Sequence, residues 1–315
     1  MEAGSTHLGG SGAPGGHRPL GVKRRRWGEE AIRALLFLAA GISILTTVGI
    51  VVALLAESIP FFVEVGSNFF TDGSWSPLFA DPEFGVWQLL NGTFLITGIA
   101  ILVAIPIGLA SAIYLSEYAT PRVRKTIKPI LEVLVGVPTV VFGYFALTFV
   151  TPEILQALGI EVKGFNALAA GLVMGIMIVP TIASISEDAM RAVPQGLREG
   201  AYGLGSTKRQ VAMRVVFPAA LSGIVAAIVL GVSRGIGETM IVLLAAGLQP
   251  NFGIDPREGF ATITTFMGSA ADGDNPAGSI GYQSIFACGT ILFFLTLAMN
   301  MIAIRFVRKY RQVYD

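Results

Sequence analysis

The sequence predicts an all-α membrane protein with six transmembrane helices, and three observations support this fold class. Of the 315 residues, 53% are hydrophobic and only 14% are charged, whereas soluble domains are usually about 25% charged. Six segments are long and apolar enough to cross a hydrocarbon layer about 30 Å thick as helices. Lysine and arginine are concentrated in alternate connections between these segments. We therefore expect an integral membrane protein rather than a soluble domain.

The six predicted spans are apolar runs separated by polar connections. They cover approximately residues 31–56, 90–115, 131–150, 166–186, 219–247 and 284–304. The first run ends without a small-residue cleavage site, and its length favours a retained anchor over a cleaved signal peptide. Residues 1–27 begin with a Gly/Ser/Pro-rich stretch and are expected to form a disordered tail, with the transmembrane domain at 28–315. Pro106, Pro138 and Pro180 are expected to kink three spans.

Orientation follows from the basic residues, which are enriched on the cytoplasmic side of membrane proteins. The N-terminal tail with the start of the first span, the 116–130 loop, the 187–218 loop and the C-terminal tail hold 19 of the 22 lysines and arginines. The sequence therefore predicts that both termini and the 187–218 loop lie in the cytoplasm. The long acidic segment at 57–89 is then external.

Aromatic residues are frequent in this external segment. Two roles remain open for them, an aromatic belt at the membrane interface or part of a docking surface. The residues concerned are Phe61, Phe62, Trp75 and Trp87.

The composition excludes several kinds of catalytic site. The single cysteine, Cys288, permits neither an internal disulfide nor a multi-cysteine metal site. Both histidines, His7 and His17, precede the first span, so the hydrophobic body has no imidazole for acid–base chemistry or zinc binding. The chain also has no G-x-x-x-x-G-K-[ST] run for binding nucleotide phosphates. We therefore expect a chain without an enzymatic or metal site of its own.

Two charged residues interrupt the fifth predicted span. Arg234 and Glu238 lie in the stretch SRGIGET, although one charge at the centre of a spanning helix costs about 2.5–3.5 kcal/mol on insertion scales. A continuous helix would place Arg234 about 22 Å along the span, near its middle, with Glu238 on nearly the same face. Gly231, Gly235 and Gly237 would leave room for a neighbouring helix or an anion. The two charges either face a substrate pathway or neutralise each other as a buried pair.

The 187–218 loop has the pattern of two short helices joined at a glycine corner. Pro194 suits the first position of a helix, and Gly205 suits its end. Thr207 and Gln210 form the T-x-x-Q capping box of a second helix. Three apolar residues with helical spacing are expected to share one face of the first helix; they are Leu197, Ala201 and Leu204. From pattern alone, a rigid cytoplasmic knob and an amphipathic loop on the membrane surface both remain open.

This loop resembles the EAA loop of ABC importer permeases. The family pattern is E-A-A, three residues, G, nine residues, then I-x-L-P, and the spacing here is the same: Glu199-Gly200-Ala201, Gly205 and Val215-Val216-Phe217-Pro218. In that family the loop is a coupling helix that binds in a groove of a cytoplasmic ATPase. The resemblance implies that Glu199 faces a basic residue of the ATPase, that Gly205 permits the corner, and that the apolar face enters the groove. Gly200 replaces the usual alanine and slightly weakens the helix.

The resemblance extends over about residues 57–308 and is most specific to the PstC-type permease of the bacterial phosphate importer. The similar stretches include LEVLVGVPTVVFGYFAL and SRGIGETMIVLLAAG. It implies a type I ABC importer permease fold in the bacterial cytoplasmic membrane. It also implies a homologous second permease as partner in a heterodimer, two cytoplasmic ATPase subunits that bind ATP and Mg, and an external phosphate-binding protein. No cofactor and no nucleic acid is expected on this chain itself.

The candidate pathway residues for phosphate lie mainly in SRGIGET: Ser233, Arg234, Glu238 and Thr239. Arginine binds phosphate oxygens two at a time through its planar guanidinium group. We hypothesise that Glu238 accepts a hydrogen bond from a protonated phosphate oxygen, which sulfate lacks at neutral pH, or else only restrains Arg234. Weaker candidates are hydroxyl or amide residues of other spans, which more often bond within their own helix; they are Asn91, Thr93, Thr139 and Thr181.

Three other functions remain open from the sequence. The first is a permease for another oxyanion, such as sulfate or molybdate, because the EAA loop does not determine the substrate. The second is a secondary anion transporter or channel that works without an ATPase, against which the ordered cytoplasmic loop argues. The third is an intramembrane enzyme, for which the chain offers no recognisable nucleophile–base pair.

Overall fold

The computed structural model describes residues 27–79 and 81–310, which fall into two units, residues 27–50 and residues 51–310. The first unit is the beginning of helix α1 (Trp27–Val65); its side chains are mostly apolar, and those whose burial is described are almost all exposed. The second unit holds the rest of the described chain. The tail predicted at 1–27 lies outside the described residues, except that Trp27 begins α1.

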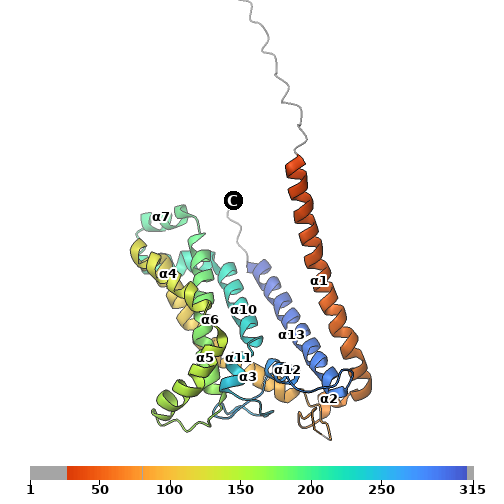
Figure 1. The fold of residues 1–315 in the computed structure, drawn as a ribbon. Helices are drawn as coiled ribbons and strands as arrows, with labels where there is room; N and C mark the ends of the chain where they lie inside the picture. The colour runs from red at the N-terminus through yellow and green to blue at the C-terminus, as the bar shows by residue number, and fades with distance from the viewer. Residues whose placement is uncertain (1–26, 80, 311–315) are drawn as a thin grey trace, which may run out of the picture. The chain divides into compact units, whose positions relative to one another are not determined.

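The second unit is built of helices, several of them long (Figure 1). After α1 they are, in order, α2 (Asn68–Thr71), α3 (Trp87–Ile113), the π-helix η1 (Tyr114–Tyr118), α4 (Pro121–Val135), α5 (Thr139–Phe145), the π-helix η2 (Ala146–Gln156), α6 (Ala167–Arg191), α7 (Gln195–Gly203), α8 (Lys208–Val211), the π-helix η3 (Ala212–Val216), α9 (Phe217–Ala219), α10 (Leu221–Ile236), α11 (Met240–Ala245), α12 (Ile263–Ala271) and α13 (Ile280–Tyr310).

The described helices confirm a membrane protein with five to six spans. Five stretches are long and apolar enough to cross a membrane: Gly28–Val65, Trp87–Tyr118, Thr139–Gln156, Ala167–Arg191 and Ile280–Arg305. A sixth is the pair Lys208–Ala219 and Leu221–Ile236, which bends by 71° at Ala220. The predicted first, second, fourth and sixth spans each coincide with one of these helices.

The third span differs from the prediction at 131–150. An amphipathic helix, α4, ends at Val135, and the apolar stretch begins only at Thr139 and continues to Gln156. The break lies at Pro138, the N-cap residue of α5. A proline disfavours helical backbone in the residue before it, which explains why the helix is interrupted here. Pro106 and Pro180, by contrast, lie inside the continuous helices α3 and α6.

The core of the unit is the close pairing of α3 with α6. A Cβ atom on Gly171 would lie 2.6 Å from Ile99 Cγ2, and one on Gly175 would lie 2.8 Å from the Ala100 carbonyl oxygen. Small residues at these positions let the two helix backbones approach, as is usual between helices in membranes. The fully buried Met174 and Ile178 continue this contact along α6.

An aromatic cluster packs around α2 and α12. Phe61 is fully buried and meets Phe69 and Phe84 edge to face at centroid distances of 5.5 and 5.1 Å, and Trp75 meets Phe266 at 4.9 Å. The expectation of an aromatic belt or docking surface is therefore wrong for Phe61 and Trp75, which belong to the core. Phe62 is half-buried beside them. Trp87 is exposed, and its indole N–H donates to the Phe70 carbonyl.

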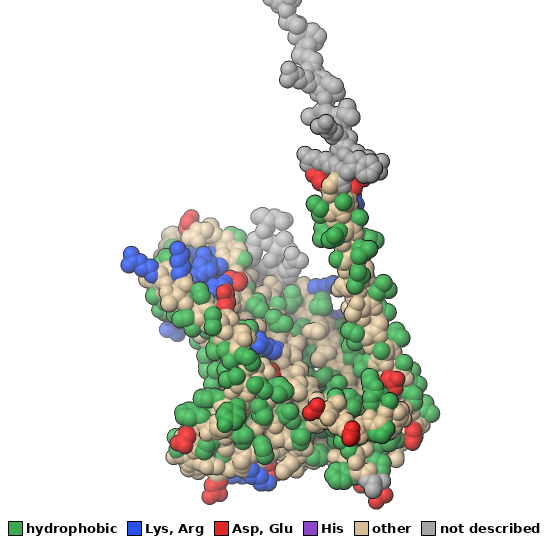
Figure 2. All heavy atoms as spheres, in the orientation of Figure 1, with side chains coloured by type: hydrophobic (Ala, Val, Ile, Leu, Met, Phe, Trp, Pro, Cys, Tyr) green, Lys and Arg blue, Asp and Glu red, His purple; other side chains and the backbone are tan. Residues whose placement is uncertain are grey.

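Many basic side chains of the second unit gather on one part of its surface (Figure 2). Figure 2 shows lysine and arginine gathered over α4 and α7, with apolar side chains covering the face below them. Large side chains of the second unit are strongly exposed, including Leu102, Tyr144 and Ile302. Such a surface is stable when lipid or another subunit covers it.

Candidate functional site

The fifth span breaks within SRGIGET, where the sequence predicted one helix over 219–247. Helix α10 ends at Ile236, Gly237 follows in helical conformation as its C-cap, and α11 begins only at Met240. Glycine lowers helix stability, and Gly235 and Gly237 lie at this point. Backbone groups at the break form hydrogen bonds outside the helix. The Glu238 carbonyl accepts a hydrogen bond from Thr264 Oγ1 in α12 at 2.8 Å, and this contact fixes the break in place.

Arg234 lies in the last turn of α10 and is half-buried. Its Nη1 donates to Thr181 Oγ1 in α6 at 3.3 Å. Among the described residues, the guanidinium group has no carboxylate within ion-pair distance. Its positive charge is therefore held in the span with a neutral partner and remains available to an anion.

Glu238 does not pair with Arg234. Its side chain is buried, and Oε1 accepts the backbone N–H of Ile241 at 3.2 Å, which caps the start of α11. The expectation of a shared helix face is wrong because α10 ends between the two residues. The interpretations that required a direct contact, a neutralising buried pair and a carboxylate that restrains Arg234, are wrong for the same reason.

The glycines of this segment differ in what they contact. A Cβ on Gly231 would lie 3.0 Å from Ile178 Cγ2, and one on Gly235 would lie 3.2 Å from Thr97 Cγ2. These two glycines therefore admit the neighbouring helices α6 and α3. Gly237 is exposed, and the nearest atoms to its added Cβ are carbonyl oxygens of α10.

The remaining pathway candidates separate into two groups. Thr239 is the N-cap residue of α11, and Ser233 Oγ is buried without a hydrogen-bond partner among the described residues. Together with Thr181 they lie around the break. Asn91 and Thr93 instead hold the connection after α11 and the start of α12, because Asn91 Oδ1 accepts the Gly253 N–H and Thr93 Oγ1 accepts the Ile263 N–H.

Thr139 and Thr264 complete the comparison with the sequence. Thr139 is the first residue of α5 and is half-buried. Thr264 is not among the residues predicted from the sequence. The threonine-rich stretch ATITTF does indicate hydrogen bonds there, since hydroxyls in apolar surroundings must find partners. Thr262, Thr264 and Thr265 are all buried, and Thr262 with Thr265 forms the capping box that begins α12.

The predicted helix, glycine corner and second helix are present in the 187–218 loop. Helix α7 ends at Gly203, and Gly205 follows with φ of 80°, a left-handed conformation that favours glycine. The Ser206 N–H reaches back to the Ala201 carbonyl at 3.1 Å, as in a Schellman motif. Thr207 and Gln210 form the expected capping box at the start of α8.

The apolar face expected on α7 is divided between two directions. Leu197 and Ala201 pack on the chain's own cluster around Met190 and Val211, whereas Leu204 is 90% exposed. The expectation of one outward face is therefore wrong for Leu197 and Ala201. The exposed residues of α7 are Gln195, Gly196, Glu199, Gly200, Tyr202 and Gly203, and Leu204, directly after the helix, is exposed as well.

Arg198 fixes α7 to the membrane domain, a contact that the motif did not indicate. Its side chain is 11% exposed, and Nη2 lies 3.2 Å from Oε1 of Glu117, itself 6% exposed, in η1. The same guanidinium group donates to the carbonyls of Val193 and Met190 at 2.6 and 2.7 Å, after and near the end of α6. One arginine thus joins α7, the end of α6 and the continuation of α3.

The class of this protein follows from comparison with known families. Residues 104–312 match the family described as binding-protein-dependent transport system inner membrane component. The match covers more than half of the chain, so the chain belongs to this family of ABC importer permeases. Its members are non-catalytic, multi-pass inner-membrane subunits that work with ATPase and substrate-binding partners.

Particular relatives narrow the comparison. The chain is 33% identical over 294 residues to a probable ABC transporter permease, YqgH, of Bacillus subtilis, covering 92% of this chain and 94% of the relative. It is 33% identical over 285 residues to the phosphate transport system permease PstC of Mesorhizobium japonicum, covering 84% and 86%. It is 29% identical to PstC of Haemophilus influenzae, covering 91% and 95%.

Solved structures share the fold. A chain of a bacterial alginate ABC transporter, in complex with an alginate pentasaccharide-bound periplasmic protein, matches with a TM-score of 0.63 at 16% identity, covering 92% of this chain and all of that one. A chain of the inward-facing MetNI methionine ABC transporter matches with a TM-score of 0.54 at 19% identity, covering 72% and 94%. The type I ABC importer permease fold predicted from the sequence is confirmed.

Proposed function

We propose that this chain is one of the two pore-forming permease subunits of an ATP-driven importer that moves inorganic phosphate across the cytoplasmic membrane by alternating access. The observation that supports an anionic substrate is the environment of Arg234. This arginine is half-buried within a span, and its hydrogen-bond partner, Thr181, is neutral. Charged residues inside a membrane usually face a pathway. A guanidinium group without a carboxylate partner suits an oxyanion, and the likeness to PstC proteins supports phosphate.

The depth of Arg234 supports this role. Helix α10 begins at Leu221, so Arg234 lies about 20 Å further along it, at 1.5 Å per residue. That distance is about two thirds of a 30 Å hydrocarbon layer. The substrate thus meets the charge inside the membrane and next to the break, where Gly237 exposes backbone.

Glu238 is proposed to select phosphate over sulfate. Its Oε1 is occupied by the Ile241 N–H, whereas Oε2 has no hydrogen-bond partner among the described residues. At neutral pH phosphate carries a proton that it can donate to such an oxygen, and sulfate carries none. A carboxylate that is offered no proton repels the anion, which favours phosphate.

Coupling to ATP is proposed to run through α7 and Arg198. In the proposed orientation both termini and α7 are cytoplasmic, because the basic residues concentrate on that side. The exposed Glu199 and Leu204 would contact one of two ATPase subunits, which bind ATP and Mg. Arg198 would pass the movement of α7 to α3 and α6, in addition to the direct chain connection through α8 and α10.

The test is uptake of labelled phosphate by the complete importer in proteoliposomes, with the homologous second permease, the ATPase subunits and the phosphate-binding protein present. We expect uptake to require ATP inside and binding protein outside, and to resist competition by excess sulfate or molybdate. Uptake without an ATPase would instead identify a secondary transporter or channel. Transport of sulfate or molybdate at the rate of phosphate would refute the substrate assignment.

A further inference from the structure

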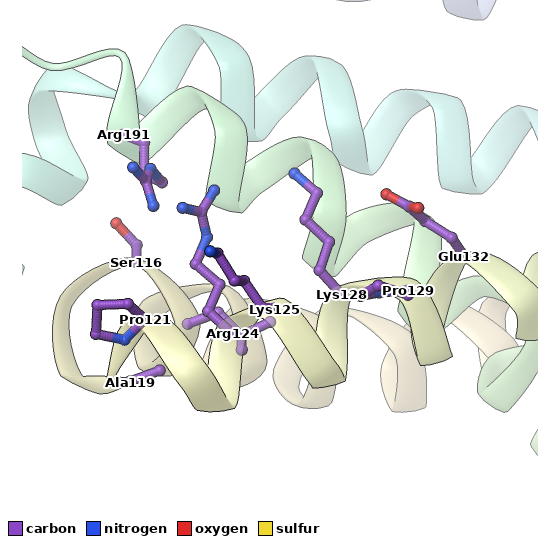
Figure 3. A pocket seen from close by; sticks show the side chains of 10 residues that line it. Ser116, Ala119, Pro121, Arg124, Lys125, Lys128, Pro129, Glu132 and Arg191 are labelled. Carbon is purple, nitrogen blue, oxygen red and sulfur yellow. The ribbon is translucent and has the colours of Figure 1, made fainter.

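A basic pocket lies between η1, α4 and the end of α6, away from the proposed pathway. It has a volume of about 490 Å³, and its lining includes Arg124, Lys125, Lys128 and Arg191. In Figure 3 the guanidinium groups of Arg124 and Arg191 lie beside Ser116 at one end, and the Glu132 carboxylate lies at the opposite end. The first end therefore gathers positive charge.

One buried carboxylate serves most of these cations. Glu187 is 1% exposed, and its oxygens lie 2.8 Å from Arg124 Nε, 3.0 Å from Lys128 Nζ and 3.8 Å from Arg191 Nε. Asp188 forms an ion pair with Lys128, its one such partner among the described residues. Like charges are thus held close together with incomplete compensation, an arrangement that an additional anion stabilises.

Several donors on these cations have no partner among the described residues. Arg124 and Arg191 approach Glu187 through Nε, so their outer nitrogens are available for a forked interaction with an oxyanion. Lys125 is exposed and has no ion-pair partner among the described residues. These groups together suit a phosphate group better than a carboxylate, because phosphate offers more oxygens to a cluster of donors.

The position of the pocket points to the membrane surface as the source of that phosphate. It lies where α3 passes into η1 and where α6 ends, so two spans reach a membrane face there. Further along α4, away from its basic first turns, Ile130 and Val133 are 60% and 71% exposed. Helix α4 therefore offers cations at headgroup depth and an apolar surface for acyl chains next to them.

We propose that this pocket binds the headgroup of an anionic phospholipid, with Arg124, Lys125 and Arg191 contacting its phosphate and Ile130 and Val133 contacting its acyl chains. Basic pockets between membrane helices bind lipid headgroups in this way. Since α4 packs on α6, which leads directly into α7, the bound lipid would hold the α4–α6 contact next to the proposed coupling helix.

The experiment is native mass spectrometry of the purified importer complex, titrated with phosphatidylglycerol, with phosphatidylcholine or with inorganic phosphate. We expect saturable binding of phosphatidylglycerol in preference to phosphatidylcholine. The double variant Lys125→Gln/Arg191→Gln should bind phosphatidylglycerol about thirtyfold more weakly. The matched control Arg122→Gln/Arg209→Gln removes the same charge from exposed residues that do not line the pocket and should bind like wild type.

A second variant guards against misfolding. Lys125→Gln changes an exposed side chain without an ion-pair partner among the described residues, and should weaken phosphatidylglycerol binding about fivefold in a fully assembled complex. Equal affinity in wild type and both pocket variants would overturn the proposal. Equal binding of phosphatidylcholine would overturn it as well. So would saturable binding of inorganic phosphate at millimolar concentration together with no binding of phosphatidylglycerol. The last outcome would identify a site for dissolved phosphate instead.

Discussion

Replacing Arg198 with methionine tests whether one side chain holds the proposed coupling helix on the membrane domain. The change removes the ion pair with Glu117 at 3.2 Å and the hydrogen bonds to the carbonyls of Val193 and Met190. It leaves Glu117, whose side chain is only 6% exposed, with a hydrogen bond from Ser116 Oγ but with no cation among the described residues to balance its charge. Breaking a buried pair on one side costs about 3–5 kcal/mol, most of it from the charge left behind.

The size of the effect separates a buried pair from a surface pair. A loss of about 3 kcal/mol lowers the unfolding temperature by about 6–12 °C in a domain of this size. The double variant Arg198→Met/Glu117→Gln should recover part of this loss, because the stranded charge is gone. The control Arg257→Met breaks an exposed pair with Asp255 and should cost less than about 1 kcal/mol.

The buried Cys288, the single cysteine of the chain, provides the assay. In a complex whose other subunits lack cysteine, a thiol-reactive fluorophore reports the temperature at which this chain unfolds. Phosphate transported per ATP hydrolysed is measured in the same preparations, and we expect Arg198→Met to lower this ratio below the wild-type value. Additive effects of Arg198→Met and Glu117→Gln, or an unfolding temperature within 2 °C of wild type in all variants, would refute the reasoning.

Three further predictions concern the proposed coupling helix α7 with its glycine corner and the break after α10. Glu199→Lys should abolish ATPase binding and phosphate uptake together, as measured by co-purification and transport; uptake that survives without bound ATPase would contradict a coupling role. Glu238→Gln keeps an oxygen for the Ile241 N–H but removes the charge, so phosphate-over-sulfate selectivity in uptake competition should fall about tenfold while the complex stays assembled; unchanged selectivity would leave Glu238 as a helix cap alone. Gly205→Ala meets no atoms within 4 Å but forces φ of 80° on a side chain, so it should cost about 1–2 kcal/mol and weaken ATPase association; wild-type association would show that the corner tolerates strain.

The spans were predictable because apolar length alone indicates them. The break after Ile236 was not, since it depends on Thr264 Oγ1 meeting the Glu238 carbonyl, a contact between residues 26 positions apart. The third span was misplaced because α4 carries enough apolar residues to extend an apolar run, and only its packing shows that one face lies on α6. Apolar length therefore located the spans but not the breaks at Pro138 and after Ile236.

A site residue was predictable where its residue type alone indicates the chemistry. It was not predictable where its role depends on contacts with residues distant in the sequence. Arg234 stands out as a charge in an apolar run, and the structure leaves it without a carboxylate partner among the described residues. Arg198 and Glu187 look like ordinary charges of a cytoplasmic loop, and only three-dimensional contacts show that one fixes α7 and the other gathers three cations. Leu197 and Leu204 share a helical spacing, but the chain's own core covers only the first of them.

The most direct test of the proposed phosphate pathway is the initial rate of labelled phosphate uptake by Arg234→Ala and Arg234→Lys in the assembled importer. We expect Arg234→Ala to lose at least about a hundredfold in rate, because a charge-assisted contact worth about 3 kcal/mol is removed. Arg234→Lys should retain part of the rate, since it keeps the charge but not the forked geometry. A normal rate in Arg234→Ala, with the complex intact and ATP hydrolysis unchanged, would contradict a phosphate contact at Arg234.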